Sequence, residues 1–140
     1  MKLLLAVDGS DCSNRAVDYL IKLLKSYKDG VELHLLNVQG PVSGNVSSFI
    51  SGDAINKFHQ EEAMKELQGA MRKLDAAKVT YRHHIGVGEP AEVIAGYAGE
   101  KGCDQIIMGT RGMGSVSNLV LGSVATKVIH LAPVPVLLVK

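Results

Sequence analysis

The stretch Asp104–Gly112 has the sequence DQIIMGTRG, a short apolar run that changes at Gly109 into a glycine-containing turn. A helical pattern follows and ends near His130. A buried strand followed by glycines and then by a helix is a common arrangement for holding phosphates. Glycines let backbone N–H groups approach a ligand closely, and the amides of a helix start face the anion. The alternative, that these glycines only make turns, stays open on this stretch alone.

The spacing of this segment is set by three glycines and a serine, at Gly109, Gly112, Gly122 and Ser123. No stretch of the chain has the sequence G-x-x-x-x-G-K-[ST], which excludes a Walker A loop. Gly112-Met113-Gly114 is followed by Ser117, where the dinucleotide fingerprint requires a third glycine, so that motif fails as well. The segment is therefore a phosphate-loop candidate of another kind.

Strand and helix patterns alternate along the whole chain. Five apolar runs predict strands, at Lys2–Asp8, Val31–Val38, Val79–Gly86, Asp104–Met108 and Pro135–Val139. Four stretches with helical spacing lie between them, at about residues 11–28, 53–78, 90–101 and 117–130. The alternation predicts right-handed crossovers, a mostly parallel five-stranded sheet and helices on both faces. We expect one doubly wound, Rossmann-like α/β domain over residues 1–140.

Several signals predict where the helices begin and end. Ser10, Asp11 or Ser13 can cap the first helix, and Gly30 suits a left-handed stop after it. Asp53 can cap the second helix and Gly102 can stop the third. An inward stripe is predicted on the second helix, at Ile55, Phe58, Met64, Leu67, Met71 and Leu74. The segment 39–53 has no period, and a loop of this length is usually functional or mobile.

Composition narrows the class of protein. The 140 residues include 46% hydrophobic and 21% charged residues, with a net charge of +1, which is typical of one soluble globular domain. No basic stripe favours nucleic acid or a membrane surface. The first apolar run ends at Asp8 with no cleavage site, so it predicts a core strand rather than a signal peptide. Cys12 and Cys103 form no C-x-x-C pair, and we expect reduced, buried thiols and a cytoplasmic location.

Three features meet at the carboxyl ends of the predicted strands, where ligands bind in open parallel sheets. Asp8 ends the first strand, Val38 ends the second, and the glycine segment follows the fourth. If the first and fourth strands are neighbours, one crevice has a carboxylate on one wall and a phosphate cradle on the other. That layout suits a nucleotide. Asp8 in the sequence Asp-Gly-Ser would equally suit a turn or a helix cap, so both interpretations stay open.

At this point the chain resembles the universal stress protein family, specifically its ATP-binding branch. The hallmark G-x2-G-x9-G-[ST] is met by Gly109, Gly112, Gly122 and Ser123. The resemblance extends over essentially the whole chain and includes LLLAVDGSDCSNRAV, LHLLNV, GVGEPAEVI, DQIIMGTRG and PVPVLLVK. Two positions depart from the family pattern. Ala6 stands where ATP-binding members often have proline, and Val124 where a second hydroxyl residue is common.

The resemblance implies a sheet with strand order 3-2-1-4-5 and a homodimer formed through the last strand, Val136–Val139. It implies that Asp8 binds ribose and that Ala6, Val7 and Val38 line the adenine site. Met108 and Gly109 would pack beside the ribose and the first phosphate. Backbone N–H groups for the phosphates would come from Gly112, Gly122, Ser123 and Val124. Arg111, which lies between the glycines, would also belong to the nucleotide site and could supply positive charge.

The expected ligand is ATP, with Mg²⁺ as an optional companion of the phosphates. Hydrolysis needs a positioned water and charge stabilisation. Arg111 and Lys127 could supply charge, but no spare base stands out in the motif. We therefore favour a stress or signalling module with an unidentified protein partner, in which ATP is regulatory and at most slowly hydrolysed. A small ATP hydrolase or phosphotransferase using the same crevice is the alternative, and a dimeric scaffold without ligand is a third. No histidine or cysteine spacing predicts a metal site.

Overall fold

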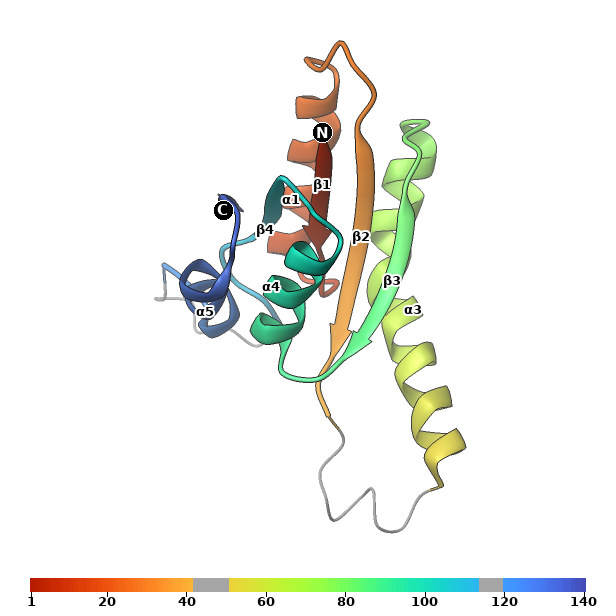
Figure 1. Ribbon diagram of the computed structural model, residues 1–140. Helices are drawn as coiled ribbons and strands as arrows, with labels where there is room; N and C mark the ends of the chain where they lie inside the picture. Colours follow the sequence, from red (N-terminus) through yellow and green to blue (C-terminus); the bar gives the residue numbers. More distant parts are fainter. Residues whose placement is uncertain (42–50, 114–119) are drawn as a thin grey trace.

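The computed structural model describes residues 1–41, 51–113 and 120–140. These residues form five strands and four helices in alternation (Figure 1). The elements are β1 (Lys2–Ala6), α1 (Asp11–Leu24), β2 (Glu32–Gln39), α3 (Gly52–Ala76), β3 (Arg82–Val87), α4 (Pro90–Glu100), β4 (Gln105–Gly109), α5 (Ser123–Leu131) and β5 (Val136–Val139).

The five strands form one parallel sheet with the order β3-β2-β1-β4-β5, which confirms the predicted fold class. The central strand, β1, pairs with β2 on one side and β4 on the other, so that Ala6 lies beside Leu36 and Met108. The strand order reverses at this point. The carboxyl ends of β1, β2 and β4 therefore meet at one edge of the sheet, which is where such folds bind ligands.

Helices cover both faces of the sheet (Figure 1). On one face α1 and α3 pack over a core that includes Leu5, Leu20 and Leu67, all fully buried. On the other face α4 and α5 pack over a second core that includes Leu4, Ile106 and Val128. The strands are apolar on both faces because both faces are covered, which explains their near-continuous apolar sequence.

Element boundaries differ from the prediction at several places. The first helix ends at Leu24, because Lys25 N and Ser26 N donate to carbonyls three residues back and close the last turn more tightly. Gly30 does not have a positive φ, so the predicted left-handed stop is wrong. β3 begins at Arg82 rather than Val79, since Val79 N donates to Leu74 O in the turn that ends α3. Other predictions are confirmed: Ser10 caps α1, and Gly102 follows α4 with φ +63°.

The second predicted helix, α3, uses Ser51 rather than Asp53 as its cap and therefore begins two residues earlier than a cap at Asp53 would place it. Its buried stripe includes Leu67 and Leu74, as predicted, but it also contains His59, Ala63 and Ala70. Phe58 and Met64 are exposed instead, so their predicted inward position is wrong. The first turns of α3 extend beyond the carboxyl edge of the sheet, where the sheet offers no face for packing (Figure 1). Most of the predicted loop 39–53 lies outside the described residues.

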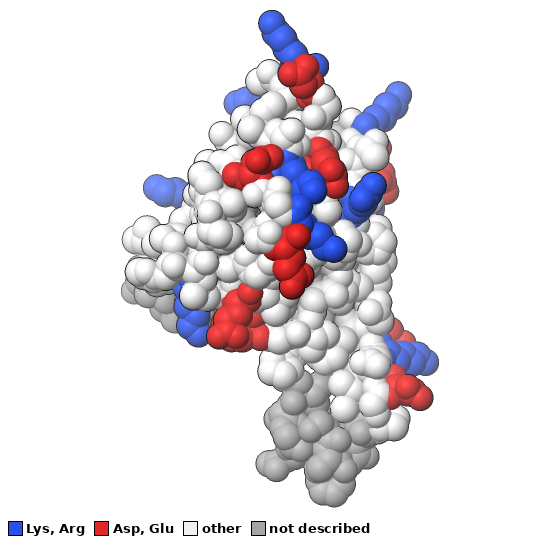
Figure 2. Space-filling model, viewed as in Figure 1, with Lys and Arg blue, Asp and Glu red and all other residues white. Residues whose placement is uncertain are grey.

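Among the described residues, the face of the molecule that α4 covers has no patch of a single charge. Basic and acidic side chains are interspersed over the face that α4 covers (Figure 2). Cys12 and Cys103 are both buried, and they are not joined in a disulfide. Among the helices that the structure describes, none has the length and apolar character needed to cross a bilayer.

Candidate functional site

A cavity of about 440 Å³ lies at the carboxyl ends of β1, β2 and β4, within the size range of small-molecule sites. All the residues that the resemblance assigns to the nucleotide site line it, and they come from segments far apart in the chain. They are Ala6, Val7, Asp8, Val38, Met108, Gly109, Arg111, Gly112, Gly122, Ser123 and Val124. The fold thus brings the carboxylate of Asp8 and the glycine segment to one cavity.

Other lining residues were not found from the sequence. They are Ser13, Leu36, Glu66, Pro90, Ile94, Thr110, Met113 and Ala125. Thr110, Met113 and Ala125 adjoin predicted residues, so their neighbours already pointed to them. Glu66 and Ile94 come from the middle of helices, where a helical pattern alone does not tell which residue reaches the edge of the sheet.

One side of the cavity is apolar. Ala6, Leu36, Ile94, Met108 and Ala125 all belong to the core under α4 and α5, and Val38 and Val124 pack against the same core. Ala6 and Met108 lie side by side on β1 and β4, so the floor of this wall is made by paired strands. A flat apolar group such as a nucleobase can be buried against a wall of this kind.

Asp8 has two roles in the structure. Its Oδ1 accepts a hydrogen bond from the amide of Ser10 at 2.9 Å, which is the turn that the sequence Asp-Gly-Ser suits. Its Oδ2 accepts from the amide of Met113 at 3.2 Å, so the carboxylate reaches across the cavity to the glycine segment. The turn-forming interpretation is therefore correct for one oxygen, while the other oxygen connects the two walls.

Gly112 and Gly109 are required for close approach. A Cβ on Gly112 would collide with Oδ2 of Asp8. A Cβ on Gly109 would lie 3.0 Å from the backbone carbon of Cys12 and 3.1 Å from Ser13 N, at the start of α1. Gly109 thus lets β4 pack tightly against α1, whereas Gly112 lets the segment after β4 approach Asp8.

The start of α5 is the most unusual part of the site. Its N-cap is Gly122, which has no side chain to accept a hydrogen bond from the first turn. In the described part of the chain, the amides of Ser123, Val124 and Ala125 have no hydrogen-bond acceptor. These three residues line the cavity. Unsatisfied amides at the positive end of a helix dipole form a binding site for an anion.

One amide departs from the expected donor set. The N–H of Gly122 donates to Thr110 O at 2.7 Å, so it closes the turn between β4 and α5 instead of facing a ligand. Lys127, considered above as a source of positive charge, is not among the lining residues, and its Nζ lies 3.5 Å from Glu89 Oε1. Arg111 does line the cavity.

Glu66 adds a second carboxylate to the cavity. Its Oε2 accepts hydrogen bonds from Asn37 Nδ2 at 2.7 Å and from Gln39 Nε2 at 3.2 Å. Partial burial raises the pKa of Glu66 above its usual value, and the Asp8 charge acts in the same direction, although the two amide donors oppose the shift.

The histidines lie away from the cavity. His34 and His84 stack with ring centroids 5.3 Å apart, and Tyr97 OH lies 2.6 Å from His34 Nδ1, beneath α4. None of the five histidines lines the cavity. Within residues 1–41, 51–113 and 120–140, no cluster of three or more His, Cys, Asp or Glu side chains could hold a metal ion.

Comparison with known proteins gives a consistent result. A model of the universal stress protein family matches residues 1–140. Universal stress protein YxiE of Bacillus subtilis is 34% identical over 148 residues, covering 99% of this chain and 98% of that protein. The solved structure of protein MJ0577 superposes with a TM-score of 0.85 at 29% identity, covering 99% of this chain and 94% of that one.

A further structure, the universal stress protein of Archaeoglobus fulgidus in complex with dAMP, matches with a TM-score of 0.70 at 24% identity. It covers 100% of this chain and 98% of that chain. At this identity the match shows a shared fold.

Proposed function

The chain belongs to the universal stress protein family, and on this premise we propose that its cavity binds ATP as a regulatory ligand. Residues 1–140 would act as one nucleotide-dependent domain in stress response or signalling, together with a protein partner. The observation that carries the proposal is the start of α5, where the amides of Ser123, Val124 and Ala125 open into the cavity without an acceptor among the described residues.

The rest of the cavity supports an orientation for the nucleotide. The phosphates would bind at the first turn of α5, since the unsatisfied amides of Ser123, Val124 and Ala125 favour negative charge. The base would lie against the apolar wall that includes Val38 and Met108. The ribose would then lie between them, next to Asp8, whose carboxylate can accept hydrogen bonds from hydroxyl groups. A relative of the same fold binds dAMP, which supports an adenine nucleotide as the ligand.

We propose regulation rather than turnover because of the groups that line the cavity. Its acids are Asp8, at the sugar position, and Glu66, on the same side, while its only basic lining residue among those described is Arg111. Phosphoryl transfer needs a group that positions the attacking water and groups that stabilise charge on the phosphate. Mg²⁺, where present, would be held mainly by the phosphates themselves.

The experiment that tests this proposal measures binding and turnover on the same preparation. Nucleotide-free protein would be incubated with ATP and Mg²⁺, and bound nucleotide and released ADP would then be measured. Retention of ATP with little ADP supports the regulatory module. Rapid multiple turnover would replace it with a hydrolase or phosphotransferase, and the absence of retention would favour a scaffold without ligand.

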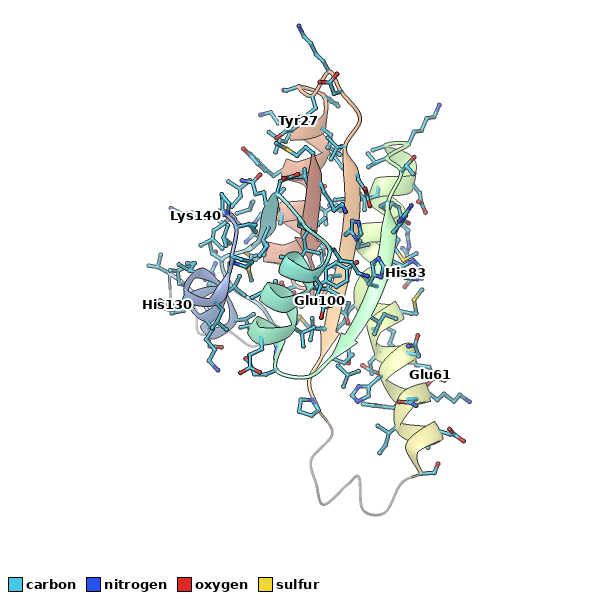
Figure 3. The ribbon with its side chains drawn as sticks, viewed as in Figure 1. Tyr27, Glu61, His83, Glu100, His130 and Lys140 are labelled. Carbon is cyan, nitrogen blue, oxygen red and sulfur yellow. The ribbon has the colours of Figure 1, made fainter. Side chains whose placement is uncertain are left out.

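We also propose that the chain forms a homodimer through β5. This strand is at the edge of the sheet and pairs only with β4 among the described strands. Ile129 and Leu131 on the neighbouring helix are 46% and 50% exposed. The labelled residues His130 and Lys140 lie on this side of the molecule, opposite Glu61 on α3 (Figure 3). An apolar edge strand favours pairing with a second copy, so sedimentation should give a dimer that Ile129→Lys, a change at an exposed position, dissociates.

The two buried thiols support a cytoplasmic location as part of the proposal. Unpaired cysteines are usual in a reducing compartment.

A further inference from the structure

Glu66 lies on the opposite side of the cavity from the apolar wall. It belongs to α3, which packs on the face of the sheet that α1 shares, whereas the apolar wall belongs to the core under α4 and α5. Asp8, which follows β1, lines the same cavity, and its charge raises the pKa of Glu66. Since Gly9, the residue after Asp8, lies against Glu66, the part of a ligand beside Asp8 is the part on the Glu66 side of the cavity.

A set of buried amides holds this carboxylate in place. Asn37 is fully buried and donates both to Val7 O at 2.9 Å and to Oε2 of Glu66 at 2.7 Å. Gln39 Nε2 donates to Oδ1 of Asn37 at 2.8 Å and to the same Oε2 at 3.2 Å. Buried side-chain amides need hydrogen-bond partners. Asn37 and Gln39, at two successive inward positions of β2, both donate to the Glu66 carboxylate and so hold it in one position.

The backbone of the turn after Asp8 lies close to Glu66. Gly9 has φ +82°, and a Cβ at this position would lie 3.2 Å from Cα of Glu66. The turn after β1 can therefore lie directly against α3. Glu66 lines the cavity, and among the residues that the structure describes its Oε1 forms no hydrogen bond, so this carboxylate keeps one acceptor oxygen for a ligand.

We propose that Glu66 is a specificity-determining residue that restricts the site to nucleotides whose sugar hydroxyls carry no phosphate. This inference rests on the proposed function, because it takes the ribose to lie beside Asp8. A carboxylate oxygen accepts a hydrogen bond from a ribose hydroxyl. The same oxygen repels a phosphate group at that position, and a like charge placed across a binding interface is strongly unfavourable. Glu66 thus makes the site bind nucleotides with only a 5′-phosphate more tightly than those with a second phosphate on the ribose.

The test compares three nucleotides on three proteins. The probes are 5′-AMP, adenosine 2′,5′-bisphosphate and adenosine 3′,5′-bisphosphate, each competing with labelled ATP on nucleotide-free protein. The proteins are the native chain, Glu66→Gln and the control Glu62→Gln. The Glu66→Gln change keeps the length of the side chain and an oxygen for Asn37 and Gln39, but it removes the charge. Glu62 lies one turn earlier on α3, pairs with Lys65 at 3.0 Å and does not line the cavity.

We expect the native chain to bind both bisphosphates at least about tenfold more weakly than AMP, because of like-charge repulsion. Glu66→Gln should reduce both ratios to about threefold or less, while Glu62→Gln should keep them. ATP affinity itself should fall by no more than about tenfold in Glu66→Gln, as for the loss of one hydrogen bond to a charged group. Circular dichroism would verify that each variant is folded.

Two results separate the inference from the function on which it rests. If native protein binds ATP but the ratios are the same in Glu66→Gln, the role given to Glu66 is wrong and the nucleotide site stands. If native protein does not bind ATP at all, the proposed function itself is wrong, and the role of Glu66, which depends on it, is wrong as well. Bisphosphates that bind native protein as tightly as AMP would also overturn the role of Glu66.

Discussion

Two helices that begin at the carboxyl edge of the sheet differ in how their first turns are satisfied. In α1 the side chain of Ser10 accepts a hydrogen bond from Ser13 N at 3.2 Å, so the chain closes its own helix start. In α5 the corresponding residue is Gly122, which has no side chain to do so. The backbone is nearly the same at both caps, with φ −68° and ψ 161° at Ser10 and φ −76° and ψ 166° at Gly122.

This difference locates the part of the site that can take an anion. The first turn of α1 has a side-chain acceptor, and that of α5 opens into the cavity. Since serine is a better N-cap than glycine, α5 gives up some helix stability. What it gains is a set of amides available to a ligand. The same comparison explains why the glycine spacing was informative in the sequence. Gly122 marks an open helix start, whose first-turn amides have no side-chain acceptor, whereas Ser10 marks a closed helix start, which has one.

The largest effect is expected when the segment before α5 is pushed away from Asp8. A Cβ on Gly112 collides with Asp8 Oδ2, so Gly112→Ala should displace the carboxylate and weaken ATP binding by about 100-fold, as for the loss of hydrogen bonds to a charged group. Gly96→Ala on α4 is the matched control, because its Cβ would have no heavy atom within 4 Å. Titration calorimetry on both variants measures the effect, and equal affinities would contradict it.

Making the two helix starts alike should have the next largest effect. Gly122→Ser gives α5 a cap like that of α1, and the dihedral angles at Gly122 suit a serine. The new Cβ would lie 3.3 Å from Arg111 Cα and 3.4 Å from Thr110 O, which requires only a small local shift. The serine hydroxyl should compete with phosphate for the first-turn amides, so ATP should bind about tenfold more weakly. A variant that binds ATP as tightly as the native chain would show that these amides are not the phosphate site.

Much of this arrangement could be predicted from sequence because it depends on position along the chain. Alternating apolar runs are enough to predict a parallel sheet, and strand ends in such a sheet meet at one edge. Asp8 and the glycine segment were therefore expected at the same place, and the strand order followed from the resemblance to the family. The dual hydrogen bonding of Asp8 could not be predicted, because it depends on where the backbone of Met113 lies.

The second carboxylate shows where sequence reasoning fails. The predicted stripe on α3 included Phe58 and Met64, both of which are exposed, and Glu66 was not among the predicted site residues. Apolar spacing does not fix how a helix is rotated when part of it extends past the sheet. The signal for Glu66 lies in β2 instead, where Asn37 and Gln39 are polar residues on the buried face of a strand. Buried amides in a core strand indicate a polar partner above them.

Removing the N-cap of α1 should lower the stability of the fold without changing the affinity for ATP. Ser10→Ala deletes the hydrogen bond to Ser13 N and should lower the free energy of unfolding by about 1 kcal/mol. ATP affinity should stay within about twofold, a difference of about 0.4 kcal/mol, because Ser10 does not line the cavity. Urea unfolding and calorimetry on one preparation measure both quantities. A large loss of affinity without a loss of stability would contradict the division between a closed and an open helix start.

The smallest effect concerns the pH dependence that Glu66 contributes. Burial raises its pKa in the folded state, and the charges of Asp8 and Glu62 act in the same direction. The folded chain therefore binds this proton more tightly than the unfolded chain, where a glutamate titrates near about 4.3. As pH rises through the interval between these two pKa values, the folded state loses stability relative to the unfolded state, and above the interval the penalty is constant.

Glu66→Gln removes this penalty, since its side chain carries no charge at any pH. At pH 7 the variant should melt at the same temperature as the native chain or slightly above it, even though its discrimination between nucleotides is weaker. The advantage should shrink as the pH falls through the interval, because the native carboxyl is then protonated in both states. Melting curves of ligand-free native, Glu66→Gln and Glu62→Gln proteins from about pH 4 to pH 8 would cover that interval. A native chain that is more stable than Glu66→Gln at pH 7 would mean that the amide donors of Asn37 and Gln39 outweigh the burial of the charge.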